Sequence, residues 1–257
     1  MSNPTSKSIF RFQITKRFVF IVLIICTSNF LYSQDNELSF GLTGGLTNSN
    51  MRQVKSLPGT YSFKPGLSTI MFLNLKTVSN FTFETDIGYY QNGYKHSDKS
   101  LIIAPDYTAK NSFVGFEFLE TQNYINNSWI AGYDFGERFT FNINLGFYWA
   151  VYMNTTIKST VYYEIDPTES SSIDLGLESG YHEETDKETN RNEGISNFDF
   201  GLSGGIICGY NINEKYHLRL ITRYNHGLVD INKSEAISDL ENYNISFFTG
   251  IGIEIKI

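Results

Sequence analysis

The chain has 257 residues, enough for one large domain or two small ones. Charged residues make up 18% of it, below the usual share of about 25%, whereas aromatic residues reach 16%. The net charge of −7 argues against nucleic acid as a partner, and two cysteines exclude a disulfide scaffold or a Cys-rich zinc module. A mean hydropathy of −0.23 excludes an ordinary polytopic helical membrane protein. An aromatic, glycine-rich and weakly charged chain remains, which is typical of a β-barrel.

Residues 1–33 have the composition of a secretory signal peptide. They contain no acidic residue and four basic ones: Lys7, Arg11, Lys16 and Arg17. The apolar run Phe18–Cys26 follows, and it is too short to span a bilayer, which needs about 20 apolar residues. The small residue Ser33 predicts cleavage before Gln34. A lipoprotein signal at Cys26 is the alternative, although Ile25 stands where a small residue is expected.

Cleavage would leave residues 34–257, which we expect to form one outer-membrane β-barrel domain. The leader carries four positive charges and no negative one, so the net charge changes from −7 to −11 on its removal. Cys208 would then be the single thiol, and no intramolecular disulfide is possible. It falls among the apolar positions of its segment and acts there as a small apolar residue.

A two-residue alternation is the strongest pattern in the mature chain. Apolar side chains occupy every odd position of one stretch: Phe139, Phe141, Ile143, Leu145, Phe147, Trp149, Val151 and Met153. The even positions between them are mostly polar or small. Residues 38–47, 81–89, 198–211, 216–225 and 245–257 alternate in the same way, and residues 67–76 and 116–133 do so less regularly. The sequence therefore predicts eight β-strands.

The apolar faces of these strands are long and aromatic, while the opposite faces carry glycine, serine, asparagine and charges. Large apolar residues outside and polar or small residues inside characterise a transmembrane barrel. Glycines on the inner face suit a narrow lumen whose walls approach closely. Trp129, Trp149 and many tyrosines near strand ends fit interfacial aromatic girdles. A soluble, lipocalin-like barrel with its apolar face inside is the alternative.

Connection lengths give an independent indication of topology. Three connections look short: Thr77–Asn80, Phe135–Arg138 and Asn211–Lys215. Four look long: about 48–62, 92–112, 156–197 and 230–243. Short and long connections alternate along eight strands, as in outer-membrane barrels with short periplasmic turns, long extracellular loops and both termini in the periplasm. The predicted fold is thus an eight-stranded antiparallel transmembrane β-barrel in the outer membrane.

Several stretches resemble the PorT-like small outer-membrane β-barrel proteins of Bacteroidota. They are FGLTGGLTNSN, KPGLSTIMFLNLK, FTFETDIGYYQNGYK, NFDFGLSGGIICGYNI, LRLITRYNHGLVDI and SFFTGIGIEIKI, and together they cover nearly the whole mature chain. Two positions depart from the family: Gln122 stands where proline is usual, and Ile257 ends the chain in place of an aromatic residue. The resemblance implies the barrel architecture and, as one version of its function, an accessory subunit of protein export or surface-protein attachment.

Charged residues on the polar faces form the candidate site. The alternation places eight of them on the lumenal face: Glu84, Asp86, Glu120, Asp134, Arg219, Arg223, Glu254 and Lys256. Glu84 and Glu120 lie about equally far from the middle of their connection, so we expect them to be cross-strand neighbours. Two adjacent carboxylates need a cation, which Arg219 and Arg223 can supply across a narrow barrel. We expect a salt-bridge network that fills the lumen, with a gated ion or proton path as the alternative.

An acidic segment, Glu164–Glu193, contains ten acidic and two basic residues, for a net charge of −8. Such a stretch cannot bury enough apolar surface to order itself well. We expect a solvated extracellular loop, or else a docking surface for a basic partner or for divalent cations that bridge lipopolysaccharide. Four residues offer oxygen ligands at alternate positions, so calcium binding is a further hypothesis although they do not match an EF-hand: Asp186, Glu188, Asn190 and Asn192.

No catalytic, metal-binding or cofactor-binding signature is present. His96 and His226 lie near the expected extracellular strand ends, where some outer-membrane enzymes place a histidine, but no nucleophile or zinc motif accompanies them. We therefore expect a non-enzymatic structural or interaction protein without cofactors. Its expected partners are outer-membrane lipids, lipopolysaccharide and an envelope protein bound through the extracellular loops. A narrow porin or small-ligand transport barrel is the alternative.

Overall fold

The computed structural model describes residues 36–53, 59–104, 107–166, 180–189, 196–231 and 242–257. In these ranges the chain forms nine strands: β1 (Glu37–Gln53), β2 (Thr60–Lys76), β3 (Phe81–Ala104), β4 (Tyr107–Phe135), β5 (Phe139–Ile165), β6 (Gly180–Thr189), β7 (Phe198–Asn211), β8 (Tyr216–Gly227) and β9 (Asn242–Lys256). No helix among the described residues is long and apolar enough to cross a membrane. The predicted signal peptide, residues 1–33, lies outside the described part of the chain.

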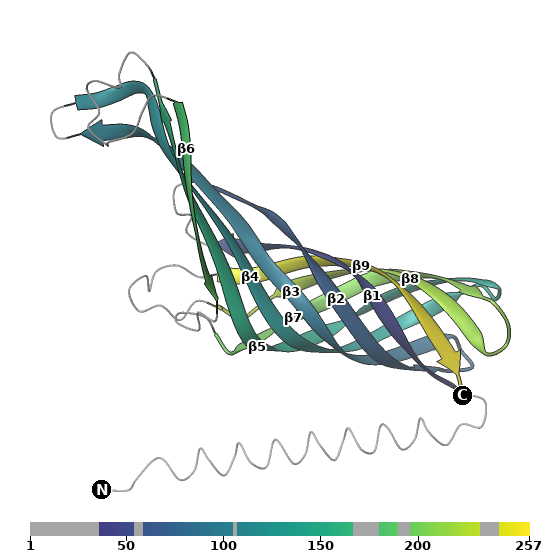
Figure 1. Cartoon of the computed structure of the whole chain (residues 1–257). Helices are drawn as coiled ribbons and strands as arrows, with labels where there is room; N and C mark the ends of the chain where they lie inside the picture. Colours follow the sequence, from purple (N-terminus) through teal and green to yellow (C-terminus); the bar gives the residue numbers. More distant parts are fainter. Residues whose placement is uncertain (1–35, 54–58, 105–106, 167–179, 190–195, 232–241) are drawn as a thin grey trace, which may run out of the picture.

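Eight of the strands close into an antiparallel ring (Figure 1). Their order is β1-β2-β3-β4-β5-β7-β8-β9, and β9 pairs with β1 to complete the circle. Closure satisfies the backbone groups of every ring strand, which is the requirement for crossing a bilayer with strands. The predicted eight-stranded antiparallel barrel is confirmed.

Three short connections lie at one end of the ring, together with the start of β1 and the end of β9 (Figure 1). We call this the turn end. The connections are residues 77–80, 136–138 and 212–215, within the segments expected from the sequence. Asn80 has φ 63° and Gly136 has φ 84°. These are left-handed conformations that asparagine and glycine adopt most readily, so both residues suit their tight turns.

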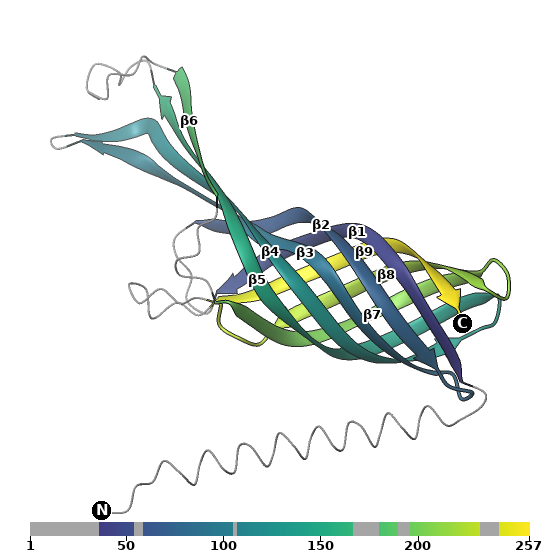
Figure 2. The same ribbon diagram turned by 60° about the horizontal axis from the view of Figure 1, so that its bottom comes forward.

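At the opposite end, three strands continue beyond the ring. The last residue of β3 that pairs with β2 is Ser97, and the last residue of β5 that pairs with β7 is Val151. At and beyond this rim, residues 95–104, 107–119 and 156–165 form a sheet with β6, which pairs with β5. We call this sheet the arm, and Figures 1 and 2 show it projecting to one side of the barrel.

The arm corrects two expectations about connections. Residues 92–112 were expected to be a loop, but β3 runs to Ala104 and β4 begins at Tyr107. The expected loop 156–197 contains the end of β5 and all of β6, so part of the acidic segment is strand and not unpaired loop. Pairing with β5 satisfies the backbone groups of β6 locally. Composition alone therefore underestimated the order of this segment.

The outer face of the barrel is apolar, as the alternation predicted. Every odd position from Phe139 to Met153 is at least 38% exposed, while Asn142, Tyr148 and Ala150 between them are buried. Cys208 is exposed on this face. Such an apolar surface is stable against lipid and not against water.

The middle of the lumen is filled by inward-facing apolar side chains: Ile70, Tyr90, Ile207, Ile221 and Phe248. Glycines on neighbouring strands make room for two of the lumenal rings. A Cβ atom on Gly45 would meet the Phe248 ring, and one on Gly41 would meet the ring of Phe72. The inner glycines thus allow large side chains to fill a narrow barrel.

Candidate functional site: the lumen charge network

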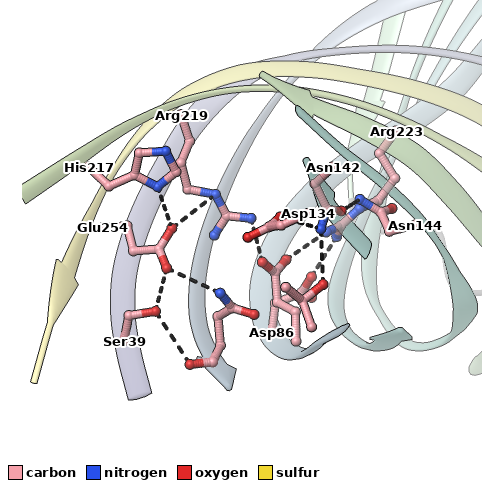
Figure 3. Close-up of polar contacts among 12 residues, drawn as sticks. Ser39, Asp86, Asp134, Asn142, Asn144, His217, Arg219, Arg223 and Glu254 are labelled. Atoms are coloured by element: carbon pink, nitrogen blue, oxygen red, sulfur yellow. Dashed lines mark hydrogen bonds and ion pairs between the residues drawn. The ribbon is translucent and has the colours of Figure 1, made fainter. Parts of the chain in front are cut away.

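The lumen network joins opposite walls of the barrel. Glu84 and Asp86 lie on β3, whereas Arg219 and Arg223 lie on β8. Four steps around the eight-stranded ring separate these two strands, so contacts between them cross the full width of the lumen. All four side chains are buried. Figure 3 shows the two arginines reaching the carboxylates of the other wall.

Arg223 bridges both carboxylates of β3. Its Nη1 donates to Asp86 Oδ2 at 2.5 Å, and its Nη2 donates to Glu84 Oε1 at 2.9 Å. Arg223 is only 1% exposed. Charge-assisted hydrogen bonds with this geometry offset the desolvation that burying the charges costs.

Arg219 extends the network toward the turn end. Its Nη2 donates to Glu84 Oε2, and its Nε lies 3.5 Å from Glu254 Oε2 on β9. The guanidinium also stacks over the Phe72 ring, 4.0 Å from the centroid. Since a guanidinium is planar and weakly hydrated, it can pair at its edge and stack on its face at the same time.

Further polar side chains complete the shell around Glu254. His217 Nδ1 lies 3.1 Å from Glu254 Oε2, and Asn74 Nδ2 donates to Oε1 at 3.2 Å. Ser39 donates its hydroxyl to the same oxygen, as Figure 3 shows. Strands β1, β2, β8 and β9 therefore all contribute to holding one carboxylate.

Glu120 is separate from this network, and its expected position beside Glu84 was wrong. Glu84 pairs with Ile130, whereas Glu120 pairs with Tyr94 nearer the arm. The expectation placed the middle of the β3–β4 connection near residue 102, but β3 continues to residue 104 and β4 starts at 107, which shifts the register. Glu120 instead accepts hydrogen bonds from Tyr94 Oη at 2.9 Å and Gln122 Nε2 at 2.6 Å.

The half of the lumen nearer the arm contains a different carboxylate, Asp199, which is 1% exposed. Tyr148 Oη donates to its Oδ2 at 3.1 Å, and Asn244 Nδ2 donates to the same oxygen at 2.9 Å. Uncharged donors therefore hold the Asp199 carboxylate, whereas arginines hold the carboxylates nearer the turn end.

Several residues of these clusters were not singled out as site residues from the sequence, among them Ser39, Asn74, Tyr148, Asp199 and His217. The parity of the alternation was a usable signal for His217, which precedes Arg219 by two residues on the same face. No signal in the sequence associates Ser39 with Glu254, because the two residues are 215 positions apart.

A polar cavity adjoins the network at the turn end. Its lining includes Glu37, Asn74, Lys76, Asp134, Asn142, His217, Arg219, Glu254 and Lys256. Lys76 pairs with Asp134 at 3.0 Å and Lys256 with Glu37 at 2.9 Å, so acidic and basic groups balance around it. This cavity belongs to the lumen network, whose buried charges are arranged in pairs suited to holding the walls together.

The metal and histidine hypotheses can be compared with the described residues. Within the described ranges, no group of three or more His, Cys, Asp or Glu residues could hold a metal ion. The calcium hypothesis depends partly on Asn190 and Asn192, which lie outside those ranges. His226 Nδ1 lies 3.1 Å from Tyr224 Oη, and the ring of His96 lies 4.4 Å from that of Tyr61, so both histidines have aromatic neighbours.

Several solved outer-membrane proteins are similar to the chain. Neisserial surface protein A is 15% identical, with 85% of this chain and 97% of that chain covered and a TM-score of 0.36. OprG from Pseudomonas aeruginosa is 11% identical over 85% and 95%, with a TM-score of 0.40, and Ail of Yersinia pestis is 7% identical over 85% and 99%, with a TM-score of 0.32. These likenesses carry no argument about function.

None of the curated proteins compared matches the chain. The family described as outer membrane protein beta-barrel domain matches residues 32–233, which is most of the sequence. The closed ring, the apolar outer face and the polar lumen are the features this description requires. The chain therefore belongs to the outer membrane protein beta-barrel domain family.

Proposed function

We propose that the protein is a non-enzymatic anchor: its closed barrel holds the arm at the membrane surface, where the arm contacts an envelope partner. The observation that carries this proposal is the filled lumen. Arg223 spans the barrel to Asp86 and Glu84, and beside it Tyr90 and Phe248 are essentially unexposed. An eight-stranded barrel filled in this way has no room for a continuous aqueous path.

Planar-bilayer recording tests the closed lumen. Purified protein should give no conductance steps, because ion pairs and apolar side chains block the lumen. Discrete steps in the wild-type protein would reject the anchor and favour the narrow porin or small-ligand transport barrel. The polar turn-end cavity is the observation on which that second candidate rests.

We propose that the arm is extracellular and that both termini are periplasmic. The support is the contrast between three short turns at one end and long strand extensions at the other. In a Cys208→Ser background, a membrane-impermeant maleimide applied to intact cells should label Ser100→Cys in the arm and spare Ser79→Cys in a turn. The reverse labelling pattern would show the opposite orientation.

The PorT resemblance implies a more specific version of the anchor function. In this version the protein is an accessory subunit in protein secretion or surface-protein attachment. An arm that projects from the barrel is suited to such contacts, with outer-membrane lipids and lipopolysaccharide around the apolar face. Extraction in mild detergent followed by native mass measurement should recover a stoichiometric protein partner. A lone monomer would reject the accessory role.

Unchanged lipid composition in His226→Ala would support a non-enzymatic function.

A further inference from the structure

The arm has two chemically different faces. On the face that continues the outer wall of the barrel, Lys95 pairs with Glu117 at 2.7 Å and Lys99 pairs with Glu164 at 2.8 Å. Lys99 also lies over the Phe113 ring, 4.3 Å from the centroid. Cross-strand ion pairs thus neutralise part of the charge on this face.

The other face of the arm continues the lumenal wall, and it carries aromatic side chains. The antiparallel register places five residues side by side, one on each strand from β2 to β6: Tyr61, His96, Phe118, Ser159 and Asp186. The rings of Tyr61 and His96 are 4.4 Å apart, and those of His96 and Phe118 are 6.3 Å apart. We call this the aromatic row.

A second row lies next to the aromatic row on the same face. In this row Asp98 of β3 lies opposite Phe116 of β4 in the strand register. Phe116 is 38% exposed and Phe118 is 39% exposed. Neither ring has lipid to face, because both lie on the lumenal side of a sheet beyond the barrel rim. A contiguous exposed apolar patch with a polar rim is typical of an interaction site.

Charge identifies the kind of partner. Strand β6, at one edge of the arm, contains four acidic residues and one lysine. Asp98 and the exposed Asp186 lie in the two rows themselves. Lysine or arginine near these groups would gain both carboxylate pairing and contact with ring faces. Acidic glycans and lipid phosphates would be repelled by the same field.

We infer that the lumenal face of the arm, centred on Phe116 and Phe118, binds a basic polypeptide segment of a partner protein. The segment inserts an apolar or aromatic side chain against the two rings and directs lysine or arginine toward Asp98 and the acidic β6 edge. This inference rests on the proposed function, in which the arm is presented to an envelope partner.

The test uses full-length protein in lipid nanodiscs and a fluorescent peptide that alternates lysine and threonine around a central tryptophan. Fluorescence anisotropy should detect saturable binding that weakens as salt is raised. The double variant Phe116→Ala, Phe118→Ala should lose about tenfold in affinity, because interface aromatics dominate binding energy. Leu119→Ala, adjacent on the opposite face of β4, is the matched control and should bind as wild type does.

Asp98→Asn should weaken binding less than the double variant, and a peptide with glutamate in place of lysine should not bind. Unchanged affinity in the double variant, equal loss in Leu119→Ala, or equal binding of the glutamate peptide would overturn the inference. Concentration-dependent dimers that the double variant abolishes would overturn it as well, since a second copy would then occupy the face. Planar-bilayer recordings test the lumen separately from the arm. If the protein conducts ions but still binds the peptide, the proposed anchor function would be rejected while the inference about the arm would stand.

Discussion

The barrel and the arm are built from the same strands, yet their polarity is reversed. Along β4, the outer wall of the barrel exposes Trp129 and the lumenal side buries Ser128. Farther along the same strand, the outer face carries the ion-paired Glu117, and the lumenal face exposes Phe118. The strand keeps its two-residue period without a register break against β3 over this span. What changes along β4 is the medium on each side.

This contrast shows that the same two-residue alternation can place apolar side chains on the outer face in the barrel and on the lumenal face in the arm. In the barrel, lipid covers the outer face, and the closed lumen forces polar groups to pair with one another. In the arm, water replaces lipid outside, and the lumenal face is no longer enclosed by an opposite wall. Substitutions that act differently in the two regions therefore test the comparison.

The largest expected effect is in the lumen. Arg223→Ala would leave Asp86 and Glu84 buried without their partner, and breaking a buried pair in this way costs about 3–5 kcal/mol. Urea unfolding in micelles, followed by tryptophan fluorescence, would measure the loss. The control is Arg138→Ala at an exposed turn, which should change the free energy of unfolding by less than about 1 kcal/mol. Equal effects of the two variants would contradict a structural role for the network.

Next in size is a charge placed on the outer face. Leu145→Arg in the barrel, where the side chain is 67% exposed to lipid, should cost about 2–4 kcal/mol. Leu119→Arg points outward from the arm into water and should cost less than about 1 kcal/mol, which includes repulsion by Lys95 and Lys158 on the neighbouring strands. Unfolding from lipid vesicles compares the two variants directly. If Leu119→Arg were as costly as Leu145→Arg, the arm would lie in the bilayer and the comparison would fail.

A smaller loss is expected from Ser39→Ala. This change removes a hydroxyl that donates to the buried Glu254, and hydrogen bonds to charged groups contribute about 1.5–3 kcal/mol. His217 and Asn74 also hold Glu254, so we expect the lower end of that range. Ser39→Thr keeps the hydroxyl and should recover part of the loss in the same unfolding measurement.

The smallest effect is predicted for the ion pair of the arm. Lys99 and Glu164 are both well exposed, and such pairs contribute less than about 1 kcal/mol. Lys99→Ala should therefore leave the unfolding midpoint nearly unchanged at physiological salt. A loss as large as that of Arg223→Ala would show that the arm's outer face is shielded from water.

Much of the fold was predictable because the two-residue alternation depends on a local property, namely the face of the strand on which each side chain lies. A side chain's parity decides whether it faces lipid or lumen, and the odd positions from Phe139 to Met153 are all exposed as expected. Parity also placed Glu84, Asp86, Arg219, Arg223 and Glu254 on the inner wall, where the structure pairs them. Register was less predictable, since an error of a few residues in one connection put Glu120 beside the wrong neighbour.

The sequence by itself determined the barrel class, the number of ring strands, the three short turns and the facing of most side chains. Each of these depends on a short-range pattern that lipid and backbone pairing enforce. Only the tertiary structure decided which carboxylate meets which arginine, because those contacts join β3 to β8 across more than 130 residues of sequence. It also decided the arm, since β6 becomes a strand by pairing with an extended β5 and not by its own composition.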